Sequence, residues 1–449
     1  MDRRKFLSGL PASVAAVYAG KFLTGCGGAA TPQPRVPTGL APPRRFVNEL
    51  NYVAAYGQSL SVGTRGTPAI STSQRFDSVM FAGGLLAQSY NPDLAFDYGS
   101  LAPLVEDDSM TNFDRTVQQA GIHGETTMSG TLEAIKELIA SQDKLTTEDI
   151  NFRLLGSCPG EGNTSISELA PGTVPYERLL YEVAQGLALA QAGSLTFGVP
   201  CITWIQGEND INTPPQDYLA ALQNLFTSFN TDIQGITGQT KDVQFIMYQT
   251  AAAGCFGIAA AQYQLTQMMT NAHIGTPCYP FQTDGAPWND LVHLTNVSYK
   301  TMGGYFGSAF KRLVVNEENW LPLSPATITA SGNVITLALN VYGGAQVVAD
   351  TVHTTTTCPV KPSLGFTLLD ASGNSLDIDG QVAVTGENQI TITSPVPVAS
   401  GFALEYGNLI NGFGGGNIRD NYGDQYVFNG GGLNVPMHNW LTVFYYQFP

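Results

Sequence analysis

The chain contains a serine, a histidine and an aspartate whose spacing suits nucleophilic hydrolysis. Ser59 follows Gly57 and Gln58 directly after an apolar run, and Asp290 lies three residues before His293. A serine hydroxyl becomes a nucleophile only beside a general base, and that base needs an acid to hold its tautomer. One loop can present Asp290 and His293 together for this purpose. The sequence therefore offers Ser59 as a candidate nucleophile and His293, oriented by Asp290, as its candidate base.

Two other segments carry groups that could assist such a reaction. The loop from Cys158 to Ile166 is rich in glycine and can direct backbone N–H groups toward a ligand. The segment Trp204-Ile-Gln-Gly-Glu-Asn-Asp210 places a side-chain amide and two carboxylates within five positions. Both segments come directly after apolar runs, so we expect their polar groups at the ends of strands.

An alternation of strands and helices must position these segments. Runs dense in β-branched and aromatic residues predict strands at Asn51–Tyr56, Asn151–Gly156, Cys201–Ile205, Val243–Gln249 and Tyr279–Thr283. Apolar residues at helical spacing predict helices at about 131–141, 176–193, 216–233, 259–273 and 295–312. The alternation predicts an α/β fold in which helices cover both faces of a parallel sheet. Such sheets bind ligands beyond the carboxyl ends of their strands, where the polar segments lie.

Four motifs in this order resemble the SGNH-hydrolase superfamily and, within it, the sialate O-acetylesterase and carbohydrate acetylesterase group. They are Gly57-Gln-Ser59, Gly162-Asn-Thr164, Trp204-x-Gln-Gly-Glu-x-Asp210 and Asp290-x-x-His293-Leu294, and they span about 51 to 312. The resemblance implies a flavodoxin-like sheet and an esterase domain at 47–318 that needs no metal or cofactor. Leu60 stands where the family usually has Asn, and Asn163 stands where a second Gly is common.

The resemblance also implies roles for the site residues. Ser59 would attack an ester carbonyl, His293 would carry the proton, and Asp290 would orient the imidazole. The Ser59 N–H, an N–H of Gly162 or Asn163 and the Gln206 amide would form the oxyanion hole. Glu208 and Asp210 are expected to support their loop. The loop 121–126, Gly-Ile-His-Gly-Glu-Thr, is an alternative source of the oxyanion donor.

The last part of the chain has a different pattern. Apolar and polar residues alternate with a period of two at 326–330, 333–339 and 388–393, and Ser331-Gly-Asn333 supplies a turn between two of these runs. We therefore expect a small antiparallel β-sandwich at 319–449.

The N-terminal sequence is typical of an export signal rather than of a folded domain. Arg3 and Arg4 precede a mildly apolar stretch, and the segment 1–25 resembles a twin-arginine signal peptide. Cys26 follows this segment directly, in a context similar to a bacterial lipoprotein processing site. Residues 26–46 are rich in Gly, Ala, Pro and Thr and predict a flexible tether. The expected location is extracytoplasmic, with the membrane contacted only through a lipid on Cys26.

Composition and charge exclude some classes of binding partner and are compatible with others. The chain has 36 acidic and 20 basic residues, a formal charge of −16, and 12% charged residues. Phosphate backbones would repel such a body, so nucleic-acid binding is not expected. Uncharged glycans are compatible partners, and the sequence leaves the oligomeric state open. The alternatives are a glycan-binding lipoprotein without activity, and a lipid esterase or O-acyltransferase that uses the same three residues.

The cysteines do not form a metal-binding pattern. There is no Cys-x-x-Cys and no cluster of histidines. An oxidising destination permits one or two disulfides among the five later cysteines, Cys255 with Cys278 being one option, but spacing does not decide the pairing. The five are Cys158, Cys201, Cys255, Cys278 and Cys358.

Overall fold

The computed structural model describes residues 48–86, 96–108, 123–281, 283, 291–353, 358–408 and 415–449. The expected signal peptide, the tether with Cys26, and Asp290 lie outside these residues. No helix within the described ranges has the length and apolar character needed to cross a membrane.

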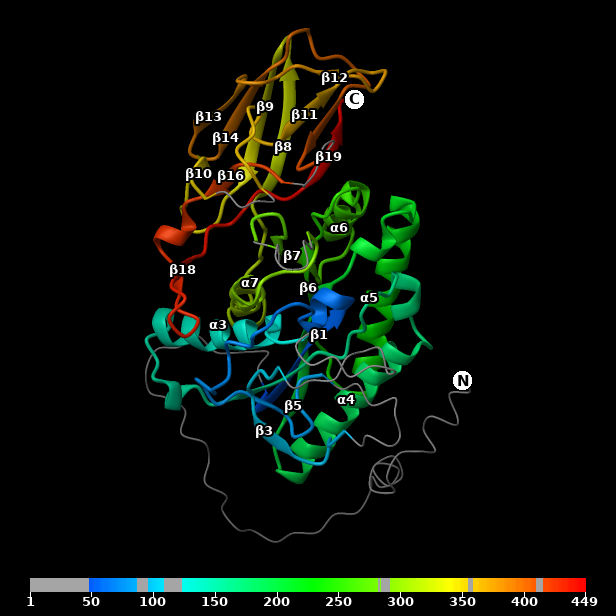
Figure 1. Cartoon of the computed structure of the whole chain (residues 1–449), viewed down its shortest axis with the longest axis vertical. Coiled ribbons are helices and arrows are strands. Elements are labelled where there is room, and N and C mark those ends of the chain that lie inside the picture. Colours follow the sequence, from blue (N-terminus) through cyan, green and yellow to red (C-terminus); the bar gives the residue numbers. More distant parts are fainter. Residues whose placement is uncertain are drawn as a thin grey trace.

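A seven-stranded sheet forms the centre of the N-terminal half (Figure 1). Its order is β3-β2-β4-β1-β5-β6-β7, and every pair is parallel except β2 with β3. The segment β4-β1-β5-β6-β7 has the 2-1-3-4-5 order of flavodoxin-like folds, which confirms the predicted fold class. The strands are β1 Leu50–Gly57, β2 Val79–Phe81, β3 Leu101–Pro103, β4 Arg153–Ser157, β5 Phe197–Ile205, β6 Gln244–Gln249 and β7 Ala272–Pro277.

Helices cover both faces of this sheet. α3 (Thr127–Gln142) and α7 (Asn296–Phe310) pack on one face, and α4 (Val174–Ala192), α5 (Pro215–Thr237) and α6 (Phe256–Met268) pack on the other. The sequence of β1 is largely apolar because both of its faces are buried. Val53 and Ala55 enter one core, and Tyr52 and Tyr56 enter the other. α3 and α7 touch closely, since a Cβ at Gly130 would lie 2.0 Å from the Lys300 carbonyl oxygen.

The last predicted strand is wrong in position. The described residues 279–281 and 283 form no strand, and the sheet ends instead with β7 at Ala272–Pro277 because α6 stops at Met268. Ala272 and Ile274 point into the core, whereas His273 bonds through Nε2 to Gln244 Oε1 at 3.0 Å. The aromatic character of Tyr279 serves a different contact, since Tyr279 packs in the core of the C-terminal domain.

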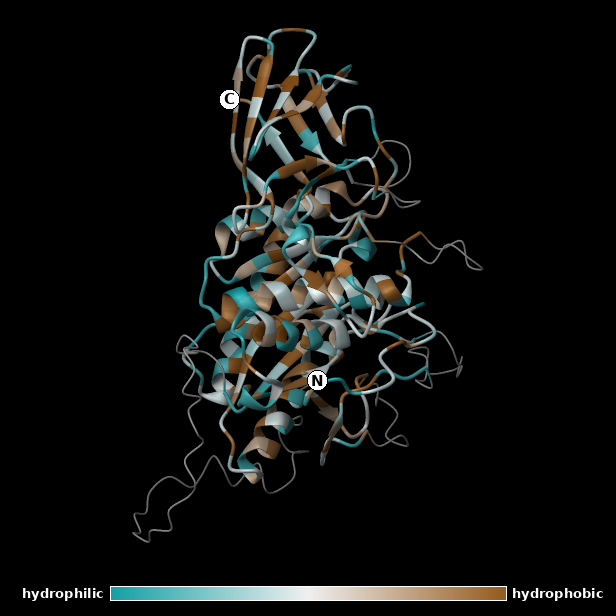
Figure 2. Cartoon of the chain, turned by 90° about the vertical axis from the view of Figure 1, so that its left-hand side faces the viewer, coloured by the Kyte–Doolittle hydropathy of each residue, from teal (hydrophilic) through white to brown (hydrophobic). Residues whose placement is uncertain are grey.

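The C-terminal part is a β-sandwich, as expected. One sheet has the order β13-β14-β9-β8 and the other β12-β11-β15-β19, all antiparallel. Their strands alternate hydrophobic and hydrophilic residues (Figure 2), and the inward residues of both sheets share one core. The strands are β8 Ser324–Ser331, β9 Val334–Asn340, β11 Phe366–Leu369, β12 Ser375–Leu376, β13 Val382–Gly386, β14 Gln389–Thr393, β15 Ala403–Tyr406 and β19 Phe444–Gln447, with short pairs β10 Val347–Ala349/β16 Ile418–Asp420 and β17 Val427–Phe428/β18 Val435–Pro436.

The sandwich rests against the carboxyl ends of β6 and β7 (Figure 1). Gln249, the last residue of β6, donates to Val443 O and accepts from Val443 N, both at 2.7 Å. Tyr279 donates to Leu441 O at 2.7 Å. Beyond α7, the buried Arg312 guanidinium lies among aromatic rings from the junction and the sandwich, 4.4, 3.4 and 4.7 Å from the centroids of Trp320, Tyr342 and Tyr422.

We expect Gly57→Ala to destabilise the protein strongly. Gly57 has φ +150°, and an added Cβ would lie 2.0 Å from the Ile205 carbonyl oxygen. Backbone strain and overpacking each cost about 1–3 kcal/mol. The measurement is the urea unfolding midpoint. Gly193→Ala is the matched control, because a Cβ there meets nothing closer than 3.5 Å, and its midpoint should stay near wild type. Equal midpoints for the two variants would contradict the close approach of β1 and β5.

Candidate active site

The structure brings Ser59 and His293 together. Ser59 begins a 3₁₀ helix, Ser59–Val62, two residues after Gly57, the last residue of β1. His293 Nε2 lies 2.7 Å from Ser59 Oγ, which is hydrogen-bonding distance for a nucleophile and its base. Both residues are half-buried. The expected orienting residue, Asp290, lies outside the described residues.

The loop of His293 is held at its C-terminal side. Leu294 is buried and pairs with Thr283 in an isolated β-bridge. Thr295 is the N-cap of α7, and its hydroxyl oxygen accepts from the Ser298 N–H at 3.2 Å. His293 therefore lies two residues before the N-cap of α7, so the capped helix end helps to hold the imidazole beside Ser59.

The loop that carries Gly162 and Asn163 packs against the nucleophile turn. Glu161 N donates to Gly57 O at 2.9 Å, and a Cβ at Gly160 would overlap Ser61 Oγ at 2.2 Å. Among the described residues, the N–H groups of Ser59, Gly162 and Asn163 donate to no protein acceptor. These three N–H groups stay candidates for the oxyanion hole.

The alternative loop at 121–126 is less suited to this role. Gly121 lies outside the described residues, and the loop pairs with the chain that follows Ser59. Gly124 N donates to Gly63 O at 3.4 Å, and Glu125 N donates to Gly66 O at 2.8 Å. Because both N–H groups already have acceptors, they are not available to a developing oxyanion.

The contacts of Gln206 differ from those expected. Gln206 is fully buried, and its Nε2 donates to Asp210 Oδ2 at 2.5 Å and to Thr164 O at 3.3 Å. Its Oε1 accepts from Tyr218 at 3.1 Å. Both amide hydrogens are therefore occupied inside the protein, and the geometry does not support Gln206 as an oxyanion donor. It instead joins the loops that follow β4 and β5.

The two carboxylates of the same segment have distinct partners. Asp210 accepts from Ile166 N at 2.7 Å and from Thr213 Oγ1 at 2.8 Å, which ties its loop to the loop after β4. Glu208 accepts from Thr250 Oγ1 at 2.6 Å and from the Tyr248 hydroxyl. Burial raises the pKa of Glu208, while these hydrogen bonds and the nearby His293 charge lower it.

Two buried glutamates bind chain segments that follow the Ser59 turn. Glu125 accepts from the N–H groups of Ile70 and Ser71 at 2.9 and 2.8 Å, and Glu106 accepts from Thr126 Oγ1 at 2.8 Å. Burial raises the pKa of both glutamates. Burial also lowers the pKa of His123 to about 4, so that imidazole is neutral near pH 7.

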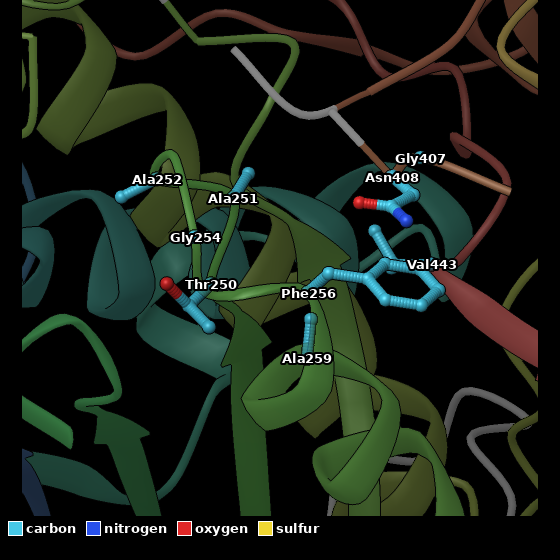
Figure 3. Close-up of a pocket in the computed structure, with 9 residues that line it drawn as sticks. All are labelled: Thr250, Ala251, Ala252, Gly254, Phe256, Ala259, Gly407, Asn408 and Val443. Atoms are coloured by element: carbon cyan, nitrogen blue, oxygen red, sulfur yellow. The ribbon is translucent and has the colours of Figure 1, made fainter. Parts of the chain in front are cut away.

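A crevice lies between the two domains, beside the loop after β5 (Figure 3). It holds about 240 Å³ of space that is partly open to solvent. Thr250 forms part of its wall and also bonds to Glu208, so the crevice adjoins the loop after β5. The lining residues are Thr250, Ala251, Ala252, Gly254, Phe256, Ala259, Gly407, Asn408 and Val443.

Sequence reasoning missed that the Asp-x-x-His spacing occurs twice. Asp350 Oδ2 lies 2.8 Å from His353 Nδ1, and Asp350 also bonds to Arg419. This pair belongs to the C-terminal domain, after β10. Only the contact with Ser59 distinguishes His293 from His353, and spacing alone does not show that contact.

The cysteine expectation also needs correction. The five described cysteines, at 158, 201, 255, 278 and 358, are buried and form no disulfide with one another, so Cys255 and Cys278 do not pair. Burial raises the pKa of each thiol. Across the residues that the structure describes, no three His, Cys, Asp or Glu side chains are grouped so that they could hold a metal ion.

Comparisons with known proteins agree with an esterase. Residues 155–312 match the family described as carbohydrate esterase, sialic acid-specific acetylesterase. The match covers about a third of the chain; it includes the loops after β4 and β5 and His293, but not Ser59. No curated protein sequence matches the chain.

Solved structures show the fold. A carbohydrate acetylesterase from Xanthomonas citri has TM-score 0.53 at 12% identity, over 89% of this chain and 80% of its own. A protein from Arabidopsis thaliana has TM-score 0.41 at 16% identity, and NanS has 0.40 at 14%; each match covers 59% of this chain and 98% of the other. The family match and the shared fold are those of a carboxylic ester hydrolase.

Glu182 gives a pH-dependent stability that can be measured. It accepts from Tyr52 in β1 at 2.6 Å and Ser157 in β4 at 2.5 Å, and burial raises its pKa from 4.5 to about 7. The folded state therefore keeps a proton that the unfolded state loses. This stability is fully present below pH 4.5 and is lost as the pH rises through about 7.

Between pH 5 and 8 the unfolding free energy of wild type should fall by roughly 2–3 kcal/mol more than that of Glu182→Gln. Glu168→Gln is the control, because hydrogen bonds from Ser165 lower the pKa of this exposed carboxylate and it stays ionised across that range. Denaturant titrations at both pH values give the comparison. Parallel pH profiles for wild type and Glu182→Gln would disprove the assignment.

Proposed function

We propose that this protein is a serine esterase that removes acetyl or other small acyl groups from carbohydrate. The observation that carries the proposal is the 2.7 Å contact between His293 Nε2 and Ser59 Oγ at the carboxyl edge of the sheet. The match to a carbohydrate esterase family over residues 155–312 supports the same reaction class.

The reaction follows from this contact. Ser59 Oγ attacks the ester carbonyl carbon while His293 Nε2 takes the hydroxyl proton. The tetrahedral intermediate collapses, the C–O bond to the sugar breaks, and His293 returns the proton to the departing sugar hydroxyl. Water, deprotonated by His293, then attacks the acyl carbon of the acyl-serine. The bond between that carbon and Ser59 Oγ breaks, His293 returns the proton to Ser59 Oγ, and the carboxylic acid leaves. Asp290 orients the imidazole, and the N–H groups of Ser59 and of Gly162 or Asn163 bind the oxyanion.

Charge favours uncharged carbohydrate as the substrate. The formal charge of −16 creates a field that repels polyanions and leaves neutral glycans unaffected. Acetate release from a panel of acetylated xylan, acetylated sialic acid and acetylated peptidoglycan would identify the sugar.

We also propose that the enzyme acts outside the cytoplasm, held to a membrane by lipid on Cys26. Support comes from the paired Arg3 and Arg4, the short apolar stretch that follows and the tether at 26–46. Such a tether would let the catalytic domain reach glycans near the surface.

Ser59→Ala and His293→Ala should each lower kcat by a factor on the order of 10⁶, and the double variant should be hardly worse, because the residues act as one unit. The assay is p-nitrophenol release from its acetate and acetate release from acetylated xylan. His353→Ala is the control: it removes the other Asp-x-x-His histidine and should keep wild-type rates. Near wild-type turnover by folded Ser59→Ala would refute the nucleophile.

Cys26→Ser should abolish membrane attachment. Any attachment through Cys26 depends on acyl chains, each buried CH₂ contributing about 0.8 kcal/mol. Fractionation of cells should therefore find the mature variant soluble or its precursor unprocessed. Cys255→Ser, which alters a buried thiol, is the control and should fractionate like wild type. Mature Cys26→Ser that still pellets with membranes would show another means of attachment.

A further inference from the structure

We propose that Gln58 is a catalytic residue whose side-chain amide donates a hydrogen bond to the developing oxyanion. The inference rests on the proposed esterase function and assigns the side-chain donor to Gln58 in place of Gln206. Gln58 directly precedes the nucleophile, between the end of β1 and the 3₁₀ helix Ser59–Val62.

The orientation of the Gln58 amide is fixed by its neighbours. Its Oε1 accepts from Gly207 N at 3.3 Å and from Asn209 N at 3.2 Å. A backbone N–H can donate only to the oxygen of the amide, so the nitrogen must occupy the other position. The loop after β5 therefore holds the Gln58 side chain in one orientation.

The nitrogen of this amide is not used within the described part of the chain. Gln58 is 4% exposed, yet Nε2 has no protein acceptor and is not among the atoms sealed in the interior. A nearly buried amide that is anchored through its oxygen and open at its nitrogen is arranged to donate to a ligand. Ser59, the proposed nucleophile, is the next residue in the chain.

The chemistry of acyl transfer accounts for such a donor. Negative charge grows on the carbonyl oxygen as Ser59 attacks, and preorganised donors stabilise it most when they need no reorientation. The two N–H groups that bind Oε1 also polarise the Gln58 amide, which strengthens Nε2–H as a donor. Gln206, in contrast, spends both amide hydrogens on Asp210 and Thr164.

A purely structural role would be different. In that case Gln58 would only connect the nucleophile turn to the loop after β5, through Oε1. Gln58→Glu separates the two roles, because it keeps an acceptor oxygen for Gly207 and Asn209 but replaces the donor with a carboxylate oxygen. Gln58→Met removes both the acceptor and the donor.

The experiment measures kcat and KM for p-nitrophenyl acetate with wild type, Gln58→Glu, Gln58→Met and Ser59→Ala. We expect both Gln58 variants to lose about 10²–10³ in kcat with KM within a few-fold, Gln58→Glu at least as much as Gln58→Met. Near wild-type kcat for Gln58→Glu with an impaired Gln58→Met would show a structural role and overturn the proposal. A raised KM with unchanged kcat would also overturn it, because Gln58 would then contact the ground state only.

The parallel Ser59→Ala variant keeps the two proposals distinguishable. If Ser59→Ala is inactive and Gln58→Glu is active, only the Gln58 assignment fails; if Ser59→Ala is active, the esterase mechanism itself fails. Should Gln58→Glu not fold, wild type labelled with ¹⁵N-glutamine gives a second test. Reaction of Ser59 with a phosphonate, whose oxygen mimics the oxyanion, should shift the Gln58 side-chain resonance, which Gln58→Met identifies. An unshifted resonance would overturn the proposal.

Discussion

The candidate site depends on the close approach of β1 and β5 at their carboxyl ends. Gly57 pairs with Ile205 at the last rung of the two strands, and Gln58 N donates to Ile205 O at 3.0 Å. The strand order reverses at this pair, because β4 follows on one side of β1 and β6 on the other side of β5. Loops that leave such a switch point diverge and expose the crevice where ligands bind in open α/β sheets. Ser59 leaves from one strand and the segment Gln206–Asp210 from the other.

The C-terminal sandwich helps to hold the loop after β5 in place. Gln249 bonds to both backbone groups of Val443, and the next residue, Thr250, bonds to Glu208. Thr250 N in turn donates to Gln262 in α6, whose Nε2 donates to Gln206 O at 2.9 Å. A continuous set of buried hydrogen bonds therefore connects Val443, directly before β19, to the loop after β5. Because unmet buried polar groups are costly, the sandwich and the site loop are expected to keep one relative placement.

The sequence predicted the four central strands β1, β4, β5 and β6, but not β2, β3 or β7 and not the side-chain partners. Continuous apolar runs predicted β1, β4, β5 and β6 because both sheet faces are buried, and parallel pairing then brought the polar segments to one edge. Tyr279 misled the prediction because an aromatic residue at a domain contact has the same local pattern as one in a strand. Gln58 and Gln206 are both amides in motifs at that edge, and only tertiary contacts show which one has an uncommitted nitrogen. The repeated Asp-x-x-His spacing likewise becomes informative only through the position of Ser59.

The segment Trp204–Asp210 acts as a junction between three loops rather than as a set of reacting groups. Trp204 Nε1 donates to Tyr218, and Gln206 and Asp210 together bind the loop after β4 through Thr164 O and Ile166 N. Gly207 N binds the Gln58 oxygen, and a Cβ at Gly207 would lie 2.9 Å from Thr250 Cγ2.

Glu208 also belongs to this junction, where Thr250 and Tyr248 hold its carboxyl group near His293. The junction thus contacts the turn before Ser59 through Gln58 and lies near His293 through Glu208. The proposed reacting residues, Ser59 and His293, lie outside this junction, after β1 and before α7.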